Sequence, residues 1–180
     1  MKGIVFTEFL SFVSTRWGEE MVDDIIDASD LPSGGAYTSV GTYSHDEMAS
    51  LGKALAARTD KAVSELIRDF GVHLSGTFAQ AYPAFFSRSG TFFDFLESIE
   101  KHIHVEVRKL YPDAELPSFR IEERSSDRLV MDYRSPRRMS ALAEGLIEGS
   151  AGQFGVQVRV TTSTLEGTDG EGTRFVIESV

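Results

Sequence analysis

The stretch of sequence that decides the fold is HVEVRKLYPDAELPSFRIEERSSDRLVMDYRSPR, at residues 104–137. It begins with apolar side chains at the three- and four-residue spacing of a helix. Pro112 and Pro117 end that helix. From there apolar and polar residues alternate, and the runs 118–125 and 128–135 predict an antiparallel hairpin with a tight polar turn. The chain therefore passes here from a helical part to a part that contains a sheet.

The residues before this stretch predict helices. The spacing of apolar residues indicates amphipathic helices over 2–16 and 18–29, and the Gly-, Ser- and Pro-rich segment 31–44 is typical of a loop. Pro83 breaks the helical pattern. Three more helices are expected: one opened by a capping box of Ser44 with Glu47 and ending near 58, one capped by Asp60 and ending near 79, and one over about 91–111.

The residues after the hairpin predict a helix over about 139–152 and two more strands, 155–165 and 173–180, joined by the turn EGTDGEG. The fold class is therefore α+β, with an α-helical N-terminal subdomain and a C-terminal subdomain in which a helix joins a four-stranded antiparallel sheet. We expect one domain over residues 1–180 with a division near residue 60, so that about 1–60 and about 61–180 are its two parts.

The composition of the chain argues against several classes of partner and of chemistry. The 180 residues carry 18 Lys and Arg against 28 Asp and Glu, a net charge of −10, which disfavours nucleic acid and anionic membrane surfaces as partners. The absence of cysteine excludes disulfides, thiolate metal sites and thiol nucleophiles. The N-terminal run MKGIVFTEFLSFV is interrupted by Glu8, has no cleavage site and is too short to cross a membrane, so a cytoplasmic protein is expected.

Two features could carry chemistry. His102 and His104 are two residues apart, so on a helix their side chains point about 200° from each other and cannot chelate one ion unless the helix is broken. One of them can face inward, and periodicity does not choose between them. At the end of the hairpin, Tyr133, Ser135 and Arg137 form a Y-x-S-x-R pattern whose phenol, hydroxyl and guanidinium are suited to carboxylates of a ligand.

Together, an inward histidine, an aromatic-lined helical cavity and a carboxylate-binding triad are what a haem requires. The sequence resembles the haem-nitric oxide/oxygen binding (H-NOX) domains, which are related to the haem domain of soluble guanylate cyclase. The resemblance extends over essentially the whole chain. It is carried by MKGIVFTEF at the start, by the segment from His104 to Phe119, by YRSPR at 133–137 and by LAEGLIEGSAGQFG at 142–155.

The resemblance implies a haem b (protoporphyrin IX iron) held between the two subdomains. It assigns the axial ligand to His104, seven residues before the Tyr of the YP pair, and the propionate contacts to Tyr133, Ser135 and Arg137. Pro117 matches the proline that presses on the macrocycle and helps to distort it.

On the distal side, members that bind oxygen stably have a tyrosine five residues after the motif's Arg, a polar residue on a neighbouring helix and an aromatic near position 9. This chain has an apolar set at and around those positions: Leu142, Leu74, Phe9, Val5, Phe78 and Leu146. Because bound oxygen needs a hydrogen bond and ferrous haem binds NO without one, we expect binding of NO and CO and discrimination against oxygen.

The resemblance further implies that NO weakens the bond to His104 and that the subdomains relax, which regulates a separate signalling protein. In bacterial relatives that protein is a histidine kinase or a cyclic-di-GMP enzyme, acting in trans. No nucleophile–base pair, P-loop or dinucleotide motif predicts an enzyme. A haem-free interaction module, or an NO-storage protein without signalling, remains the alternative.

Overall fold

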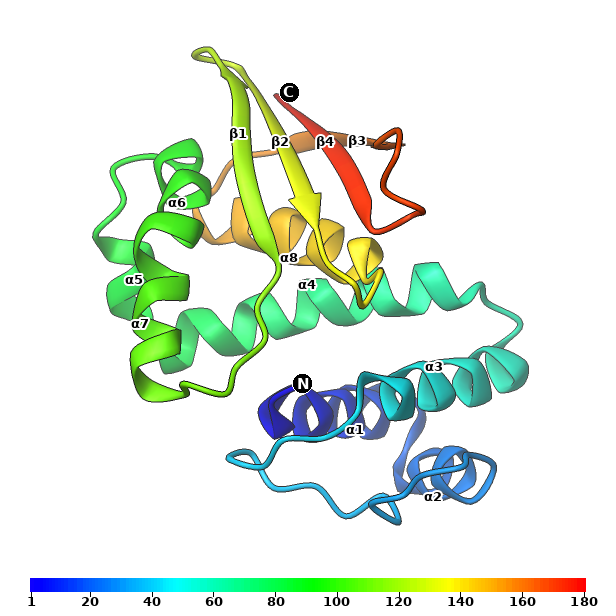
Figure 1. Ribbon diagram of the computed structural model, residues 1–180. Coiled ribbons are helices and arrows are strands. Elements are labelled where there is room, and N and C mark those ends of the chain that lie inside the picture. Colours follow the sequence, from blue (N-terminus) through cyan, green and yellow to red (C-terminus); the bar gives the residue numbers. More distant parts are fainter. The chain divides into compact units, whose positions relative to one another are not determined.

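The chain forms the α+β fold that the sequence predicts (Figure 1). The computed structural model describes residues 1–180, which divide into two compact units, Met1–Phe70 and Gly71–Val180. The boundary falls inside the helix α4 (Val63–Ala81). None of the helices combines the length and the apolar character that a membrane crossing requires. The expected division of the domain near residue 60 stays a prediction.

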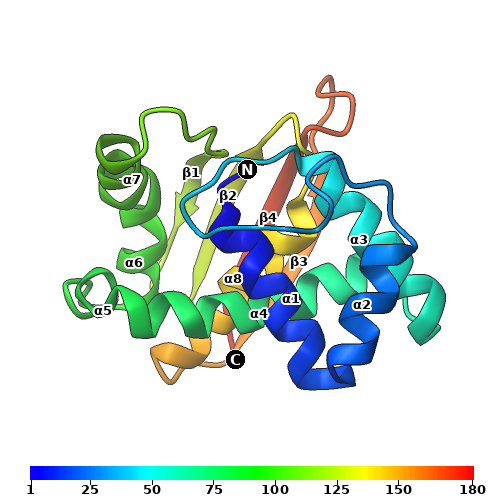
Figure 2. The same cartoon turned by 90° about the horizontal axis from the view of Figure 1, so that it is seen from below.

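The first unit is a set of helices with one long loop. It contains α1 (Gly3–Trp17), α2 (Glu19–Asp27), α3 (His45–Thr59) and the start of α4. In Figure 2, α1 and α2 lie side by side, and the loop between α2 and α3 passes the N-terminus of α1. The fully buried side chains of the core are Phe6, Phe9, Phe12, Val13, Ile25, Met48, Leu51, Leu55, Leu66 and Phe70.

The polar residues at the ends of α3 do not make all the capping contacts that the sequence predicts. Ser44 caps the helix, but its hydroxyl accepts the N–H of Asp46, and no reciprocal capping box with Glu47 forms. The Glu47 carboxylate is instead buried and accepts the hydroxyls of Ser33 and Tyr37, which fixes the long loop. Asp60 does not cap α4, because it ends α3 in the left-handed conformation at φ 52°.

The helices of the second unit are more divided than their periodicity indicates. A short helix, α5 (Pro83–Ser87), begins at Pro83, where the sequence predicts only a break in the helical pattern. The single helix expected over 91–111 is three segments: α6 (Phe92–Ser98), the π-helix η1 (Ile99–Ile103) and α7 (His104–Leu110). The apolar residues Ile99, Ile103, Val107 and Leu110 keep three- and four-residue spacing through this segment, so periodicity does not reveal the additional residue of the π-turn.

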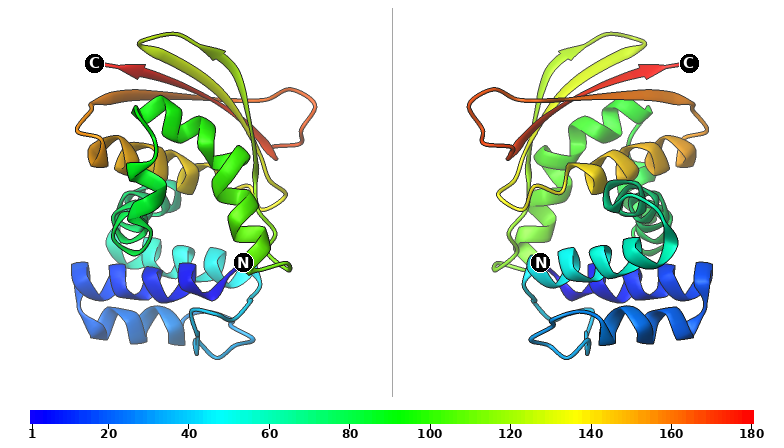
Figure 3. Two further views of the ribbon diagram at one scale, coloured as in Figure 1. Left: turned by 90° about the vertical axis from the view of Figure 1, so that its left-hand side faces the viewer. Right: turned by 90° about the vertical axis from the view of Figure 1, so that its right-hand side faces the viewer.

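The sheet confirms the predicted strands. It contains β1 (Ser118–Arg124), β2 (Arg128–Arg134), β3 (Val158–Thr164) and β4 (Gly172–Ser179), all antiparallel, in the order β1-β2-β4-β3. The helix α8 (Ser140–Gln153) lies along one face of the sheet (Figure 3). The core of this unit is formed by apolar side chains from the sheet, α8 and α6. They are Leu129, Met131, Tyr133, Phe175 and Ile177 of the sheet, Ala143, Ile147 and Ala151 of α8, and Phe92, Phe93, Phe95 and Leu96 of α6.

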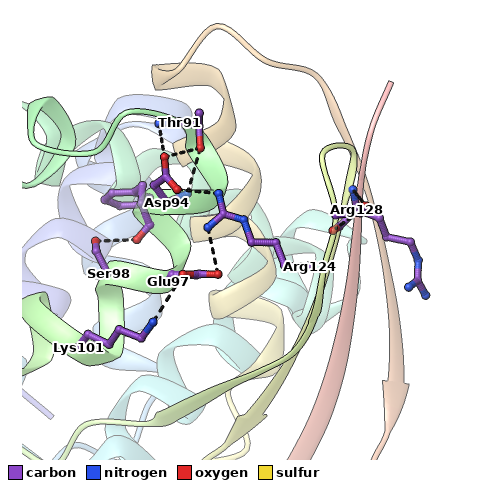
Figure 4. A network of polar contacts seen from close by, with 9 residues as sticks. Thr91, Asp94, Glu97, Ser98, Lys101, Arg124 and Arg128 are labelled. Carbon is purple, nitrogen blue, oxygen red and sulfur yellow. Dashed lines mark hydrogen bonds and ion pairs between the residues drawn. The ribbon is translucent and has the colours of Figure 1, made fainter.

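Two ion pairs join α6 to β1. The guanidinium of Arg124 in β1 lies 2.6 Å from Asp94 Oδ1 and 3.0 Å from Glu97 Oε1 (Figure 4). Asp94 also closes a capping box with Thr91 at the start of α6. The helix that leads to His104 is therefore tied to the strand that follows it.

Candidate cofactor site

The two histidines of the H-x-H pair have different environments. His104 is the first residue of α7 and is only 8% exposed, whereas His102 is exposed. The Nδ1 atom of His104 lies 3.0 Å from Glu100 Oε2. Its Nε2 atom makes no hydrogen bond to the protein. Burial lowers the pKa of His104 despite the neighbouring carboxylate, so the neutral ring that binds metals is favoured.

Glu100 was not predicted from the sequence, and it is the main polar neighbour of His104. Its Oε2 also accepts the backbone N–H of Phe119 at 3.2 Å, and its Oε1 accepts Arg108 Nη2 at 3.3 Å. Burial acts to raise the pKa of Glu100, but the hydrogen bonds from His104, Phe119 and Arg108 outweigh it and lower the pKa. The signal available in the sequence was a carboxylate four residues before the histidine, on the same helical face.

Phe119 connects the surroundings of His104 with those of the Y-x-S-x-R pattern. Its ring centroid lies 5.8 Å from that of His104 and 5.5 Å from that of Tyr133. Pro117, half-buried, comes just before β1 and two residues before Phe119. The structure therefore brings His104, Pro117 and Tyr133 to one end of the second unit, through β1 and its neighbour β2.

The Y-x-S-x-R residues lie partly on the strand β2 and partly in the turn that follows it. Tyr133 and Ser135 are buried, and β2 ends at Arg134. Arg137 lies in the following turn, where its backbone N–H donates to Ser135 Oγ at 3.3 Å, so strand alternation does not place all three side chains on one face. Burial raises the pKa of Tyr133, against the hydrogen bond with Ser135 that lowers it.

The guanidinium of Arg137 is incompletely satisfied. Its side chain is 11% exposed, and its buried Nε atom has no hydrogen-bond partner. The carboxylate of Glu115 is 4.0 Å away, beyond hydrogen-bond distance, and is itself exposed. A buried donor without a partner costs roughly 1–3 kcal/mol, so this atom is suited to an incoming carboxylate.

The apolar residues expected on the distal side belong to three helices. In the second unit, Leu74 and Phe78 lie on α4, and Leu142 and Leu146 lie on α8. These helices approach closely, because a Cβ atom at Gly71 would be 2.5 Å from the carbonyl oxygen of Leu142. Leu74 is 1% exposed, and the other three are partly buried. Val5, partly buried, and Phe9, fully buried, lie on α1 of the first unit.

The polar groups of the second unit fit a haem. An unpartnered imidazole Nε2 is the atom that an iron porphyrin takes as axial ligand, and a phenol, a hydroxyl and an unsatisfied guanidinium match its propionates. The roles of the individual residues stay predictions.

Comparisons with known proteins agree with this reading. The model of the family described as Haem-NO-binding matches residues 2–162. An H-NOX protein from K. algicida, in the Fe(II) unliganded state, is 40% identical, with 100% of this chain and 97% of that chain covered and a TM-score of 0.94. A comparison with curated proteins finds no match.

Two structures from Shewanella oneidensis are each 26% identical over 100% of this chain and 99% of that chain. One is an H-NOX protein in the Fe(II)NO ligation state, with a TM-score of 0.90, and the other an H-NOX domain in the Fe(II)CO ligation state, with a TM-score of 0.87. Because the family model matches nearly the whole chain and a solved H-NOX structure is 40% identical to it, the protein belongs to the haem-NO-binding, or H-NOX, family of gas sensor domains.

Proposed function

We propose that the protein binds haem b through His104 and senses NO and CO while discriminating against oxygen. The observation that carries the proposal is the buried imidazole of His104, whose Nδ1 is engaged by Glu100 and whose Nε2 has no partner in the protein. A bound ferrous haem would supply an iron with one coordination position open to a diatomic gas. The lone pair on Nε2 would hold that iron from the proximal side.

The propionates are proposed to contact Tyr133, Ser135 and Arg137. The buried Nε of Arg137 supports this, because a carboxylate would give it the partner that it lacks. The phenol of Tyr133 stays protonated at neutral pH, since burial raises its pKa, and it can therefore donate. Pro117 is proposed to press on the macrocycle.

Selectivity between gases is proposed to come from the apolar distal set. Its members are Val5, Phe9, Leu74, Phe78, Leu142 and Leu146. None of these side chains can donate a hydrogen bond, and oxygen needs such a donor more than NO or CO does. The hydroxyl of Ser75, which follows Leu74 on α4, lies 3.1 Å from the hydroxyl of Ser150.

The output is proposed to be a movement of the helix that carries His104 when that ligand is released. Regulation of a separate protein in trans, either a histidine kinase or a cyclic-di-GMP enzyme, would follow from a change in the population of two conformations. The π-helix η1 supports the proposal, because such segments are often found at functional sites.

The first experiment is the absorption spectrum of the purified protein, reduced without oxygen and then divided between air and NO. We expect a five-coordinate ferrous spectrum that changes with NO and forms no stable oxygen complex. His104→Gly should abolish this spectrum, whereas the matched variant His102→Gly should keep it. A colourless protein that takes up no haem would favour the haem-free interaction module, and an unchanged spectrum in His104→Gly would exclude this ligand.

A further inference from the structure

Glu100 collects donors from two different segments of the second unit. His104 Nδ1 and Arg108 Nη2 approach it from α7, at 3.0 and 3.3 Å, and the N–H of Phe119 approaches it from β1 at 3.2 Å. One carboxylate thus joins the candidate ligand to the strand that begins just after Pro117. Its side chain is 33% exposed, so the contact is partly shielded from water.

The local backbone explains how this contact arises. Glu100 lies in the π-helix, whose wider turn lets the N–H of His104 donate to the carbonyl oxygen of Ile99. Such turns are rare and are frequently found at functional sites. Here the turn sits immediately before His104, and its carboxylate faces the ring.

The hydrogen bond has a chemical consequence for the ring. A carboxylate can only accept, so the atom that faces it, Nδ1, must carry the proton. In a neutral imidazole the other nitrogen, Nε2, then carries the lone pair. A carboxylate behind a ligating histidine also fixes the ring orientation and makes the ligand a stronger donor.

We infer that Glu100 is a positioning residue that sets the tautomer and the orientation of His104 and links this ligand to β1. The part that concerns iron rests on the proposed function, but the tautomer does not depend on it. Arg108 contacts the other carboxylate oxygen, is 45% exposed, and is the one formally charged side chain in contact with Glu100, because His104 is neutral. It neutralises the carboxylate only in part.

The first test is NMR of ¹⁵N-labelled protein as purified, or of its diamagnetic CO complex if it contains haem. We expect a slowly exchanging proton on Nδ1 of His104. Glu100→Leu should lose this protected proton, and Glu100→Gln, whose amide oxygen still accepts, should keep it. The control is Glu97→Gln, whose carboxylate contacts Lys101 and Arg124 instead (Figure 4). A proton on Nε2 in the wild-type, haem-free protein, or an Nδ1 proton that survives in Glu100→Leu, would overturn the inference.

The second test uses the haem-loaded protein. Loss of a carboxylate behind a metal-binding histidine weakens metal binding about 10- to 100-fold, so Glu100→Leu should lower haem affinity by roughly tenfold. Its iron–histidine stretching frequency, measured by resonance Raman, should fall, and Glu100→Gln should give an intermediate value. If Glu100→Leu had the same haem affinity and the same iron–histidine frequency as Glu97→Gln, the inference would be contradicted, while His104 would remain the ligand. If Glu100→Leu does not fold, the isosteric Glu100→Gln alone decides the outcome by its lower frequency.

Discussion

Leu142 is the residue at which gas selectivity can be tested most directly. It is partly buried in the first turn of α8 and offers no hydrogen-bond donor. Leu142→Tyr would place a phenol there, and one neutral hydrogen bond contributes about 0.5–1.5 kcal/mol. We therefore expect the oxygen affinity of the reduced protein to rise roughly 2- to 12-fold, as measured by spectrophotometric titration with oxygen.

The matched control for this substitution is Leu142→Phe, which adds the ring without the hydroxyl. It should leave oxygen affinity near the wild-type value, because an aromatic ring alone does not donate to bound oxygen. An equal gain in both variants would show that ring size, and not hydrogen bonding, limits oxygen binding. No gain in Leu142→Tyr would show that the phenol does not reach the gas.

At the scale of elements, the close approach of α4 and α8 depends on glycine. A Cβ atom at Gly71 would lie 2.5 Å from the carbonyl oxygen of Leu142 and 2.9 Å from Gly145 Cα and Leu146 N, all of them backbone atoms. Gly71→Ala must therefore push the helices apart, at a cost of about 1–3 kcal/mol. The measurement is the free energy of unfolding in urea.

Gly152, on the same helix α8, provides the control. A Cβ atom at this exposed position would meet nothing within 4 Å, so Gly152→Ala removes only the cost of glycine in a helix. It should stabilise the protein by about 0.5–1 kcal/mol. If both substitutions change stability in the same direction, close helix packing is not the reason for glycine at position 71.

An ion pair between strands, in which only the carboxylate is buried, predicts how the sheet responds to acid. Asp132 in β2 lies opposite Arg174 in β4 and accepts two hydrogen bonds from it, at 2.7 and 2.9 Å. These bonds lower the pKa of Asp132. The contribution to stability is therefore complete above the unfolded-state pKa of about 3.9 and is lost as the pH falls through the lower folded-state pKa.

Asp132→Asn should consequently destabilise the protein at pH 7 by about 1 kcal/mol, since Arg174 is partly exposed and the pair is screened. The difference from wild type should shrink once the pH is below about 4. Urea unfolding at neutral and acid pH measures both values. Asp30→Asn, at an exposed position after α2, should show neither effect, and a difference that grows in acid would contradict the prediction.

At the scale of the whole molecule, the sequence predicts what depends on periodicity. The strands β1 and β2 and the helices α1 and α8 follow from apolar spacing, and resemblance to the family supplied the candidate site. Spacing cannot predict features that depend on tertiary contacts. The π-helix before His104, the contact of Glu100 with Phe119 and the turn that brings in Arg137 all require knowledge of which segments are neighbours in space.

The net charge of −10 also acts on the molecule as a whole, and it is concentrated near α2. Glu19, Asp23 and Asp27 follow one another at four-residue spacing on this helix, so Asp23 repels a like charge on both sides. Each such pair destabilises a helix by about 0.2–0.5 kcal/mol.

Asp23→Asn should therefore stabilise the protein by about 0.4–1 kcal/mol at low salt, measured by urea unfolding. The gain should nearly vanish in about 1 M NaCl, where charges are screened within about 3 Å. Asp24→Asn should gain less, because Asp24 lies 3.9 Å from Arg58 and loses that contact. Equal gains that persist in salt would mean that side-chain repulsion on α2 does not limit stability.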